Sequence, residues 1–430
     1  MLIIKKILLL LVFIIFLYVL WQLIILRINL KKELNKPLTE NFQEGLSLSS
    51  SSLFSSNEKN ELSTMTSTFP ILIKNMNKTK NLKLRDYCIK SSYNTAVSGN
   101  YVSTDTISYI ISRGVRYLDF EIFYIDLNVL NNNNISSIAN YEPVVGYSTD
   151  STYVQLNTLN IILLQDALTT AISKAFISST PNNQDPLIIN LRIKSNNQDV
   201  YSSVAKCIDN NIYSNLYVDP NDSYVINDGE KANTRNVAKK ITKDTRIFDI
   251  MGSLIISLDI TYFPNYENAI CEIKSDNTCK YLLHNYINIE NGGSDMILSI
   301  YDYLINKTTI VPNKDGTTNI DNIYVAVPNP KLNNSNPSFG DLLLKFGYPI
   351  IPYQFYLFDS ELEDYEKFFN DNKSAFVPLA DSITYFKRNI PKPSNRSNNN
   401  VIQEQSNIYY YTKMTALLII IGLFILSNKQ

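Results

Sequence analysis

The stretch Leu84–Thr95 reads LRDYCIKSSYNT and opens the part of the chain whose pattern decides the fold. An apolar start followed by small polar residues is typical of a buried strand that ends in a polar loop. Gly114–Glu121 reads GVRYLDFE and Asp185–Arg192 reads DPLIINLR, so two more apolar runs carry charged side chains near their ends. Because parallel sheets gather their chemistry at the carboxyl ends of strands, these stretches predict a site at that edge.

Strand-like runs alternate with helical patterns between residues 80 and 390. The strand candidates are Leu84–Ile89, Arg116–Phe123, Pro143–Tyr147, Leu187–Ile193, Leu254–Ile260, Tyr281–Ile289, Ile323–Val327 and Ile350–Leu357. The helix candidates are Asp105–Ser112, Leu159–Phe176, Val200–Asn210, Thr234–Thr242, Asp295–Ile305, Phe339–Phe346 and Ser360–Phe369. Strands that alternate with helices imply parallel strands joined by crossovers. About eight such strands predict an α/β fold, a TIM-type (β/α) barrel, with an open α/β sheet as the alternative.

Both ends of the chain carry long apolar runs. After a short flank at 1–6, residues 7–28 match the thickness of a bilayer, and no small-residue cleavage site follows, which indicates a transmembrane signal anchor. A shorter run at 411–427 begins beside a tyrosine cluster and predicts a second transmembrane helix. We therefore expect a membrane protein of one or two passes with the folded unit on one side. Positive charges flank both ends of the first run, so they do not indicate on which side of the membrane the folded unit lies.

Two segments without periodicity separate these runs from the folded unit. Residues 29–79 include a Ser- and Thr-rich stretch, and residues 391–410 include three consecutive asparagines, so both are predicted to be flexible tethers. The folded unit is then 80–390.

The net charge and the cysteines limit the kinds of partner and site that the chain can have. The formal net charge of -1 argues against a nucleic-acid partner, which favours a basic surface. The four cysteines lack metal-binding spacing. Cys271 and Cys279 form a disulfide if the domain lies in an oxidising compartment, and the alternative is four buried thiols. His284, the single histidine, is interpreted as a structural residue.

The sequence resembles phosphatidylinositol-specific phospholipase C over its X region. Leu84–Thr95 is similar to that family's first strand, which ends in Ser-Ser-His-Asn-Thr, and Gly114–Glu121 is similar to its Gly-x-Arg strand with two acids. Glu142–Tyr147 (EPVVGY) stands where the family has a strand ending in His-Gly, and Asp185–Arg192 where it has a strand ending in Glu. More loosely, Val327–Phe355 resembles the family's Y region. The resemblance implies a PLC-like phosphodiesterase barrel.

The same resemblance implies that the reaction centre has departed from the family. Members cleave a phosphodiester with two histidines as general base and general acid, and these positions hold Tyr93 and Tyr147. Tyrosine, with a pKa near 10, is a poor base at neutral pH. Val325 and Val327 occupy the positions of a substrate-contacting Arg and Tyr.

The calcium pocket implied by the resemblance is half retained. Asn94, Asp119 and Glu121 occupy ligand positions, but the fourth position is Arg192. A guanidinium beside two carboxylates replaces the charge of the metal by ion pairs. We therefore predict no metal and no cofactor. The alternative is that Asp119, Glu121 and Arg192 form a purely structural cluster of ion pairs.

These observations predict a membrane-anchored, catalytically inactive member of the PLC-like phosphodiesterase group with a binding or structural role. Its partners are then the lipid bilayer and a phosphoinositide or other phosphate-bearing ligand. The alternative is an active, metal-independent phosphoric diester hydrolase. If the fold is instead an unrelated α/β one, Asn94, Asp119, Glu121 and Arg192 should not meet.

Overall fold

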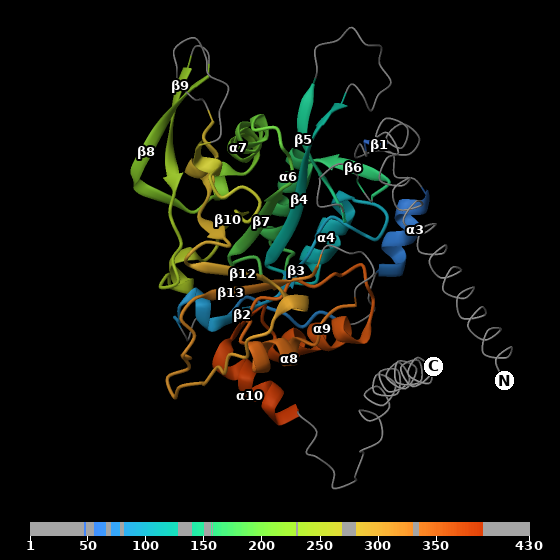
Figure 1. Ribbon diagram of the computed structural model, residues 1–430, viewed down its shortest axis with the longest axis vertical. Coiled ribbons are helices and arrows are strands. Elements are labelled where there is room, and N and C mark those ends of the chain that lie inside the picture. The colour runs from blue at the N-terminus through green and yellow to red at the C-terminus, as the bar shows by residue number, and fades with distance from the viewer. Residues whose placement is uncertain are drawn as a thin grey trace, which may run out of the picture. The chain divides into compact units, whose positions relative to one another are not determined.

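The computed structural model describes residues 47–48, 56–65, 70–77, 81–127, 140–149, 156, 158–228, 231–268, 281–329 and 335–389 (Figure 1). The predicted transmembrane segments at 7–28 and 411–427, the tether at 391–410, and Cys271 and Cys279 lie outside these residues. Within the described part, no helix is both long and apolar enough to cross a bilayer.

The described residues up to Ile383 belong to one compact unit of mixed α/β class. Its strands are β1 (Ser47–Leu48), β2 (Tyr87–Ile89), β3 (Ser91–Ser92), β4 (Tyr117–Asp126), β5 (Tyr141–Gly146), β6 (Asn160–Leu163), β7 (Leu187–Ile193), β8 (Val218–Asp228), β9 (Lys231–Ala238), β10 (Leu254–Asp259), β11 (Ile289–Asn291), β12 (Met296–Ile300), β13 (Ile323–Val327) and β14 (Phe376–Pro378). Its α-helices are α3 (Ser56–Met65), α4 (Thr104–Ser112), α6 (Leu164–Ala175), α7 (Asp199–Asn211), α8 (Phe339–Asp341) and α9 (Ser360–Asn372). Helix α10 (Leu379–Asn389) continues into a second unit, Thr384–Gln430, of which the structure describes only the first residues.

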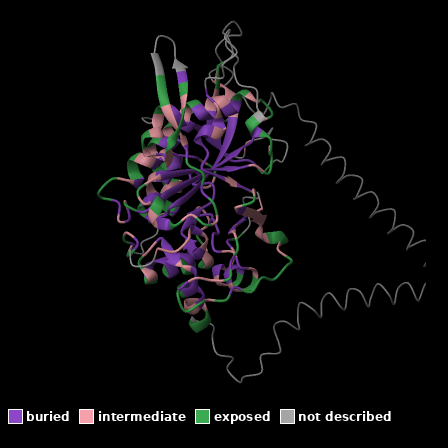
Figure 2. Ribbon diagram, turned by 90° about the vertical axis from the view of Figure 1, so that its left-hand side faces the viewer, coloured by how far each residue is buried: buried purple, intermediate pink, exposed green. Residues whose placement is uncertain are grey.

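A sheet with parallel strands at its centre organises the unit. Its strand order is β1-β6-β5-β4-β7-β10-β11-β12-β13, with β3 paired to β4. In the sheet order β4-β7-β10-β11-β12-β13, all neighbouring strands are parallel. Strand β5, on the other side of β4, is antiparallel to both of its neighbours. Every residue of β7 and β10 is buried, as expected for strands covered on both faces. Figure 2 shows the buried residues concentrated in this sheet.

Hydrogen bonding continues beyond β13 as isolated parallel bridges. Val325 of β13 bridges Ile350, which in turn bridges Ile89 of β2, and Tyr353 bridges Ser92 of β3. The peptide N–H of Ala326 donates to Ile350 at 2.9 Å, and that of Tyr353 donates to Ser91 at 3.0 Å. The segment around Ile350 therefore hydrogen-bonds both to β13 and to the strands that precede β4.

Local sequence explains where several helices begin. The Ser103 hydroxyl accepts from the Thr106 N–H at 3.1 Å before α4, and the Asp359 carboxylate accepts from the Leu362 N–H at 2.9 Å before α9. These are N-caps of the preferred residue types. The π-helix Leu342–Phe346 ends at Gly347, whose φ of 80° favours glycine.

Two helix predictions were wrong. Thr234–Thr242 lies largely in β9, which pairs with β8 as a long hairpin, and most of Asp295–Ile305 lies in β12 and the 3-10 turn that follows it. In both segments, pairing with a neighbouring strand overrides a weak helical pattern.

Other element predictions changed in part. The predicted strand Tyr281–Ile289 contains a 3-10 turn, Leu283–Tyr286, and only Ile289 belongs to β11, while the predicted strand Leu84–Ile89 begins as a 3-10 turn and becomes β2 at Tyr87. The predicted helix Leu159–Phe176 begins with β6 and becomes helical only at Leu164, and the predicted strand Ile350–Leu357 contributes isolated bridges rather than a ladder.

The predicted tether at 29–79 contains structure. Helix α3 lies within it and is bound to the loop before α4 through Glu61, whose carboxylate accepts from the Ser98 hydroxyl and from the N–H groups of Asn100 and Tyr101. At residues 56–65 this segment is therefore helical and attached to the folded unit.

Candidate functional site

The four residues predicted for the calcium pocket meet at one place. Asp119 and Glu121 lie on the same face of β4, and Glu121 is paired in register with Arg192 on the parallel neighbour β7. Asn94 follows β3 at a φ of 45°, a left-handed conformation that asparagine tolerates, and its N–H donates to Asp119 Oδ2 at 3.1 Å. These four residues therefore lie together rather than apart.

Arg192 occupies the centre of this group. Its Nε lies 2.9 Å from Asp119 Oδ1, and its Nη2 lies 2.8 Å from Asp119 Oδ2 and donates to Asn94 Oδ1. Its Nη1 lies 3.7 Å from Glu121 Oε1. Burial alone lowers the pKa of Arg192, but Asp119, Tyr93 and Glu121 outweigh it, and the pKa is raised well above the usual value. The guanidinium therefore stays charged and contacts each of the three predicted calcium ligands, Asn94, Asp119 and Glu121.

Lys194 adds a second cation that sequence reasoning missed. It lies two residues after Arg192, directly after the end of β7, is 2% exposed, and forms an ion pair with Glu121. Burial lowers the pKa of this lysine, and Glu121 opposes that shift. The spacing of two from Arg192 was a usable signal, because alternate strand residues share a face.

A network of buried amide and hydroxyl side chains also holds the Asp119 carboxylate. Asn190 Nδ2 donates to Asp119 Oδ1 at 2.8 Å, and Asn190 Oδ1 accepts from the Ser257 hydroxyl at 2.9 Å and from Asn291 Nδ2 at 3.1 Å. All of these residues are buried. Asp119 is therefore held both by Arg192 and by the side-chain network on β7, β10 and β11.

Tyr93 and Tyr147, the two tyrosines that the sequence analysis predicts at the reaction centre, are both buried. Tyr93 packs its ring against the guanidinium of Arg192, with 4.4 Å from Cζ to the ring centroid. Tyr147 follows β5 beside Glu121, and its hydroxyl has no hydrogen-bond partner among the described residues. Burial raises the pKa of both phenols. Neither hydroxyl is a base at neutral pH.

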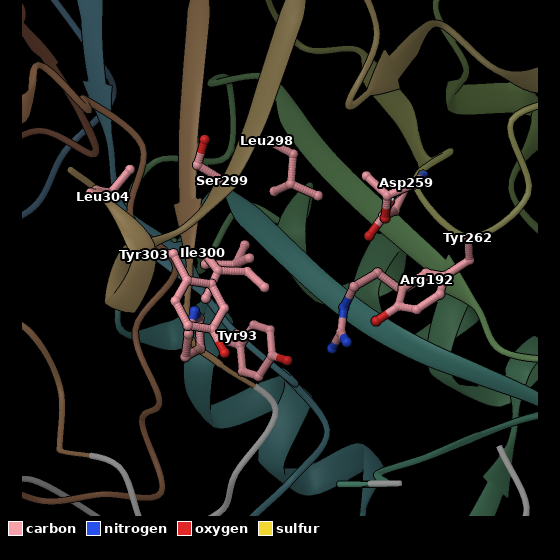
Figure 3. Close-up of a pocket in the computed structure, with 12 residues that line it drawn as sticks. Tyr93, Arg192, Asp259, Tyr262, Leu298, Ser299, Ile300, Tyr303 and Leu304 are labelled. Carbon is pink, nitrogen blue, oxygen red and sulfur yellow. Dashed lines mark hydrogen bonds between the residues drawn. The ribbon is translucent and has the colours of Figure 1, made fainter. Parts of the chain in front are cut away.

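A cavity of about 390 Å³ opens beside Arg192 at the carboxyl ends of the strands (Figure 3). Its lining consists of Tyr93, Arg192, Asp259, Thr261, Tyr262, Leu298, Ser299, Ile300, Tyr303, Leu304, Val327 and Pro328. Val327 lines the cavity, whereas Val325 is fully buried in β13.

Asp259 and the tyrosines at 262 and 303 were not identified from the sequence. Asp259 ends β10, one residue before the end of the strand predicted at Leu254–Ile260, so its position at the carboxyl edge was a signal. His284 lies in a 3-10 turn outside the cavity lining, and burial lowers its pKa.

The donor set does not fit a calcium ion. Calcium takes oxygen ligands, but Asn94 and Asp119 already accept from Arg192, and Glu121 is paired with Lys194 and accepts from the N–H of Ser148. Within the described residues, no group of three or more His, Cys, Asp or Glu side chains could hold a metal.

The sequence matches no protein-family model and no curated protein. Among solved structures, the phospholipase C PLC21 of S. officinalis is similar over 72% of this chain, with 13% identity and a TM-score of 0.43. PLC21 of L. pealei is similar over 73% of this chain, with 12% identity and a TM-score of 0.44. The chain spans 39% of the length of each of these structures.

Proposed function

We propose that the chain is a membrane-anchored protein with a PLC-like phosphodiesterase barrel that binds a ligand without turning it over. The observation that carries this proposal is Arg192 within hydrogen-bonding distance of Asn94 and Asp119. In a metal-dependent centre those oxygens would hold the cation that lowers the pKa of the attacking hydroxyl. Here they stabilise a guanidinium that belongs to the protein.

Loss of acid–base chemistry points the same way. The two positions that would move protons hold Tyr93 and Tyr147, whose pKa values are raised by burial. Each missing general acid or base typically costs about 10²–10⁴-fold in rate. Without both, and without the metal, little turnover is expected.

The proposed barrel is a closed ring of the TIM type. The support is the pair of parallel bridges that link Ile350 to Val325 and to Ile89, together with the bridge from Tyr353 to Ser92. Counting the segment around Ile350 as a strand, the ring runs through β3, β4, β7, β10, β11, β12 and β13. Such a ring places Arg192, Asp259 and Val327 around one mouth.

The proposed attachment to a bilayer rests on sequence. Residues 7–28 and 411–427 are apolar runs near the length that spans hydrocarbon. The lipid bilayer is therefore the proposed partner, and the two tethers separate it from the barrel.

An assay of inositol phosphate release tests the absence of turnover. The full chain in detergent micelles is given phosphatidylinositol with and without calcium, beside an active phospholipase C as a positive control. We expect no product above that of the heat-denatured chain. Release that disappears in the variant Asp119→Asn would overturn the proposal.

A second candidate is a metal-independent phosphodiesterase, favoured by one observation: Arg192 lies on the cavity wall as well as in the ion-pair cluster. In that role its guanidinium would stabilise the charge that develops on the phosphorus oxygens. This candidate predicts release without calcium that is abolished in Arg192→Lys, because an ammonium lacks the bidentate fork.

A further inference from the structure

The cavity beside Arg192 has two unlike walls. In Figure 3, Asp259 and Tyr262 lie on the side of Arg192, whereas Leu298, Ile300 and Leu304 come from β12 and the residues that follow it. Its volume of about 390 Å³ suits a small organic molecule. The walls therefore offer one polar end and one apolar side to a ligand.

The cations near the cavity are already paired. Arg192 donates to Asp119 and Asn94 and lies 3.7 Å from Glu121, and Lys194 is paired with Glu121. Two carboxylates thus face two cations, and their formal charges cancel. An anionic ligand would have to break one of these buried pairs to gain a partner.

Asp259 is a charged residue of the cavity lining that takes no part in these ion pairs. It is 6% exposed, and its Oδ1 accepts from the N–H of Thr261 at 2.9 Å and from the hydroxyl of Thr261 at 2.6 Å. Its Oδ2 has no hydrogen-bond partner among the described residues, and no described cation forms an ion pair with it. Burial raises the pKa of Asp259, and the nearby positive charge of Arg192 opposes this shift without cancelling it. A ligand cation that reaches Asp259 on the cavity wall would stabilise the ionised carboxylate, and this geometry points to a cationic ligand.

Aromatic rings complete the chemistry of the lining. Tyr262 and Tyr303 are 44% and 65% exposed and line the cavity together with Tyr93. Rings in this region already take cations on their faces, since Arg192 lies over Tyr93 and Lys194 Nζ lies 5.8 Å from the centroid of Tyr262. Tyrosine faces attract organic ammonium groups, most strongly where water is excluded.

We propose that this cavity binds an alkylated ammonium group, with its positive charge at Asp259 and its methyl or alkyl carbons against the tyrosine rings and the aliphatic wall. The resemblance to phospholipases implies a phosphate-bearing ligand, and the paired state of Arg192 and Lys194 argues for the opposite charge. A metal ion would satisfy Asp259 but would leave the apolar wall without a partner. The ammonium group can come from a free amine such as choline or from the headgroup of a choline lipid.

The first experiment uses the unaltered full chain in detergent whose headgroup carries no ammonium. Calorimetric titration with choline is compared with 3,3-dimethylbutan-1-ol, which has the same shape but no charge, and with inorganic phosphate. Choline should bind at least about tenfold more tightly than the neutral alcohol, and phosphate should not compete. Equal binding of the alcohol and choline, or binding of phosphate alone, would overturn the proposal.

The second experiment uses matched variants. Asp259→Asn keeps the shape of the side chain and the hydrogen bonds from Thr261 and removes the charge; it should weaken choline binding about tenfold or more. Asp302→Asn removes an exposed charge beside Tyr303 and should change binding less than twofold. Equal losses in the two variants would mean that Asp259 does not hold the ligand.

Vesicles separate the two sources of the ammonium group. If the ligand is a lipid headgroup, phosphatidylcholine vesicles should compete with choline for the full chain, and phosphatidylglycerol vesicles should not. If only free choline binds, the ligand is a soluble amine.

The inference rests on the proposed binding role, but the two fail separately. Release of inositol phosphate would overturn the absence of turnover. A folded, inactive chain that does not bind choline would overturn only the class of ligand.

Discussion

Arg192 is the buried cation at the centre of the candidate site. Its side chain is 5% exposed and forms ion pairs with Asp119 and Glu121. Removing one partner of a buried ion pair leaves the other charge unpaired, which typically costs about 3–5 kcal/mol.

We therefore expect Arg192→Met to lower the free energy of unfolding by about 3–5 kcal/mol, since it leaves two buried carboxylates with Lys194 alone. Urea denaturation measures this loss. Lys345→Met is the matched control, because Lys345 pairs with Asp341 at the surface, where such a pair contributes less than about 1 kcal/mol. Equal losses in the two variants would show that the cluster is not buried as described.

Asp185 gives a prediction that depends on pH. This fully buried carboxylate accepts from the N–H of Met76 at 2.8 Å, and burial raises its pKa from 3.8 to about 6. The folded state then holds a proton more tightly than the unfolded state. Stability is unaffected by this group below about pH 4, falls as pH rises to about 6, and stays reduced above that.

Asp185→Asn keeps an acceptor for Met76 and removes the ionisation. Relative to the unaltered chain, its melting temperature should rise progressively between pH 4 and pH 6.5, by an amount that reflects about 2–3 kcal/mol at neutral pH. Thermal melts in a pH series test this. Parallel curves for the two proteins across the series would contradict the raised pKa.

At the scale of the element, the strands predicted best were those without a competing pattern. Leu187–Ile193 and Ile323–Val327 have the same bounds in the sequence prediction and in the structure, because each is short and rich in the Ile, Val, Leu or Tyr residues that suit strands. The run at Met296–Ile300 is just as apolar, but a period of two and a period of 3.6 fit five residues equally well. Only its pairing with β11 and β13, which sequence cannot reveal, makes it a strand.

The candidate site was predicted to a similar extent. Asn94, Asp119, Glu121 and Arg192 were found because motif spacing places them at strand ends, and they do meet. Tyr303 was missed because no motif marks it and its position depends on how distant strands align. Asp259 also lies in no motif, and its place near the end of a predicted strand was a signal that the sequence prediction did not use.

Helix α3 was missed because its sequence, SNEKNELSTM, has no apolar stripe. It is held instead by polar contacts: Glu61 binds the loop 98–101, and Glu58 accepts from Asn160 Nδ2 at 2.9 Å. The loop that Glu61 binds lies between Asn94 and α4. In the proposed topology this contact joins the tether from the membrane anchor to the border of the site.

We expect Glu61→Ala to detach α3, since it removes the acceptor of Ser98, Asn100 and Tyr101 together. Amide exchange at Asn100 and Tyr101 should accelerate by at least about tenfold, and limited proteolysis should cut within 56–69 sooner. Asn60→Ala, on the neighbouring exposed position, serves as the control and should change neither. Unchanged protection in Glu61→Ala would show that other contacts hold the helix.

At the scale of the whole molecule, the proposed closed ring differs from an open sheet at one place. This place, called the seam below, is the set of hydrogen bonds between the segment around Ile350 and its neighbours β13 and β3. In an open sheet, β13 is an edge strand, and the hydrogen bonds from Ala326 to Ile350 and from Tyr353 to Ser91 can open locally. In a closed ring, those bonds belong to the same cooperative unit as the centre of the sheet. The amide of Ile188, which donates to Arg116 at 2.8 Å, is a reference for that centre.

We therefore expect the amides of Ala326 and Tyr353 to exchange with the same free energy of opening as the amide of Ile188, to within about 1 kcal/mol. Native-state hydrogen exchange in increasing urea measures all three in one protein and needs no substitution. A closed ring predicts that their opening free energies converge on the global value and fall with the same dependence on urea. If Ala326 and Tyr353 exchange several kcal/mol more easily, with little dependence on urea, the seam opens by itself. The sheet is then open at β13, and Tyr93, whose N–H donates to Tyr353, would lose its fixed place against Arg192 whenever the seam parts.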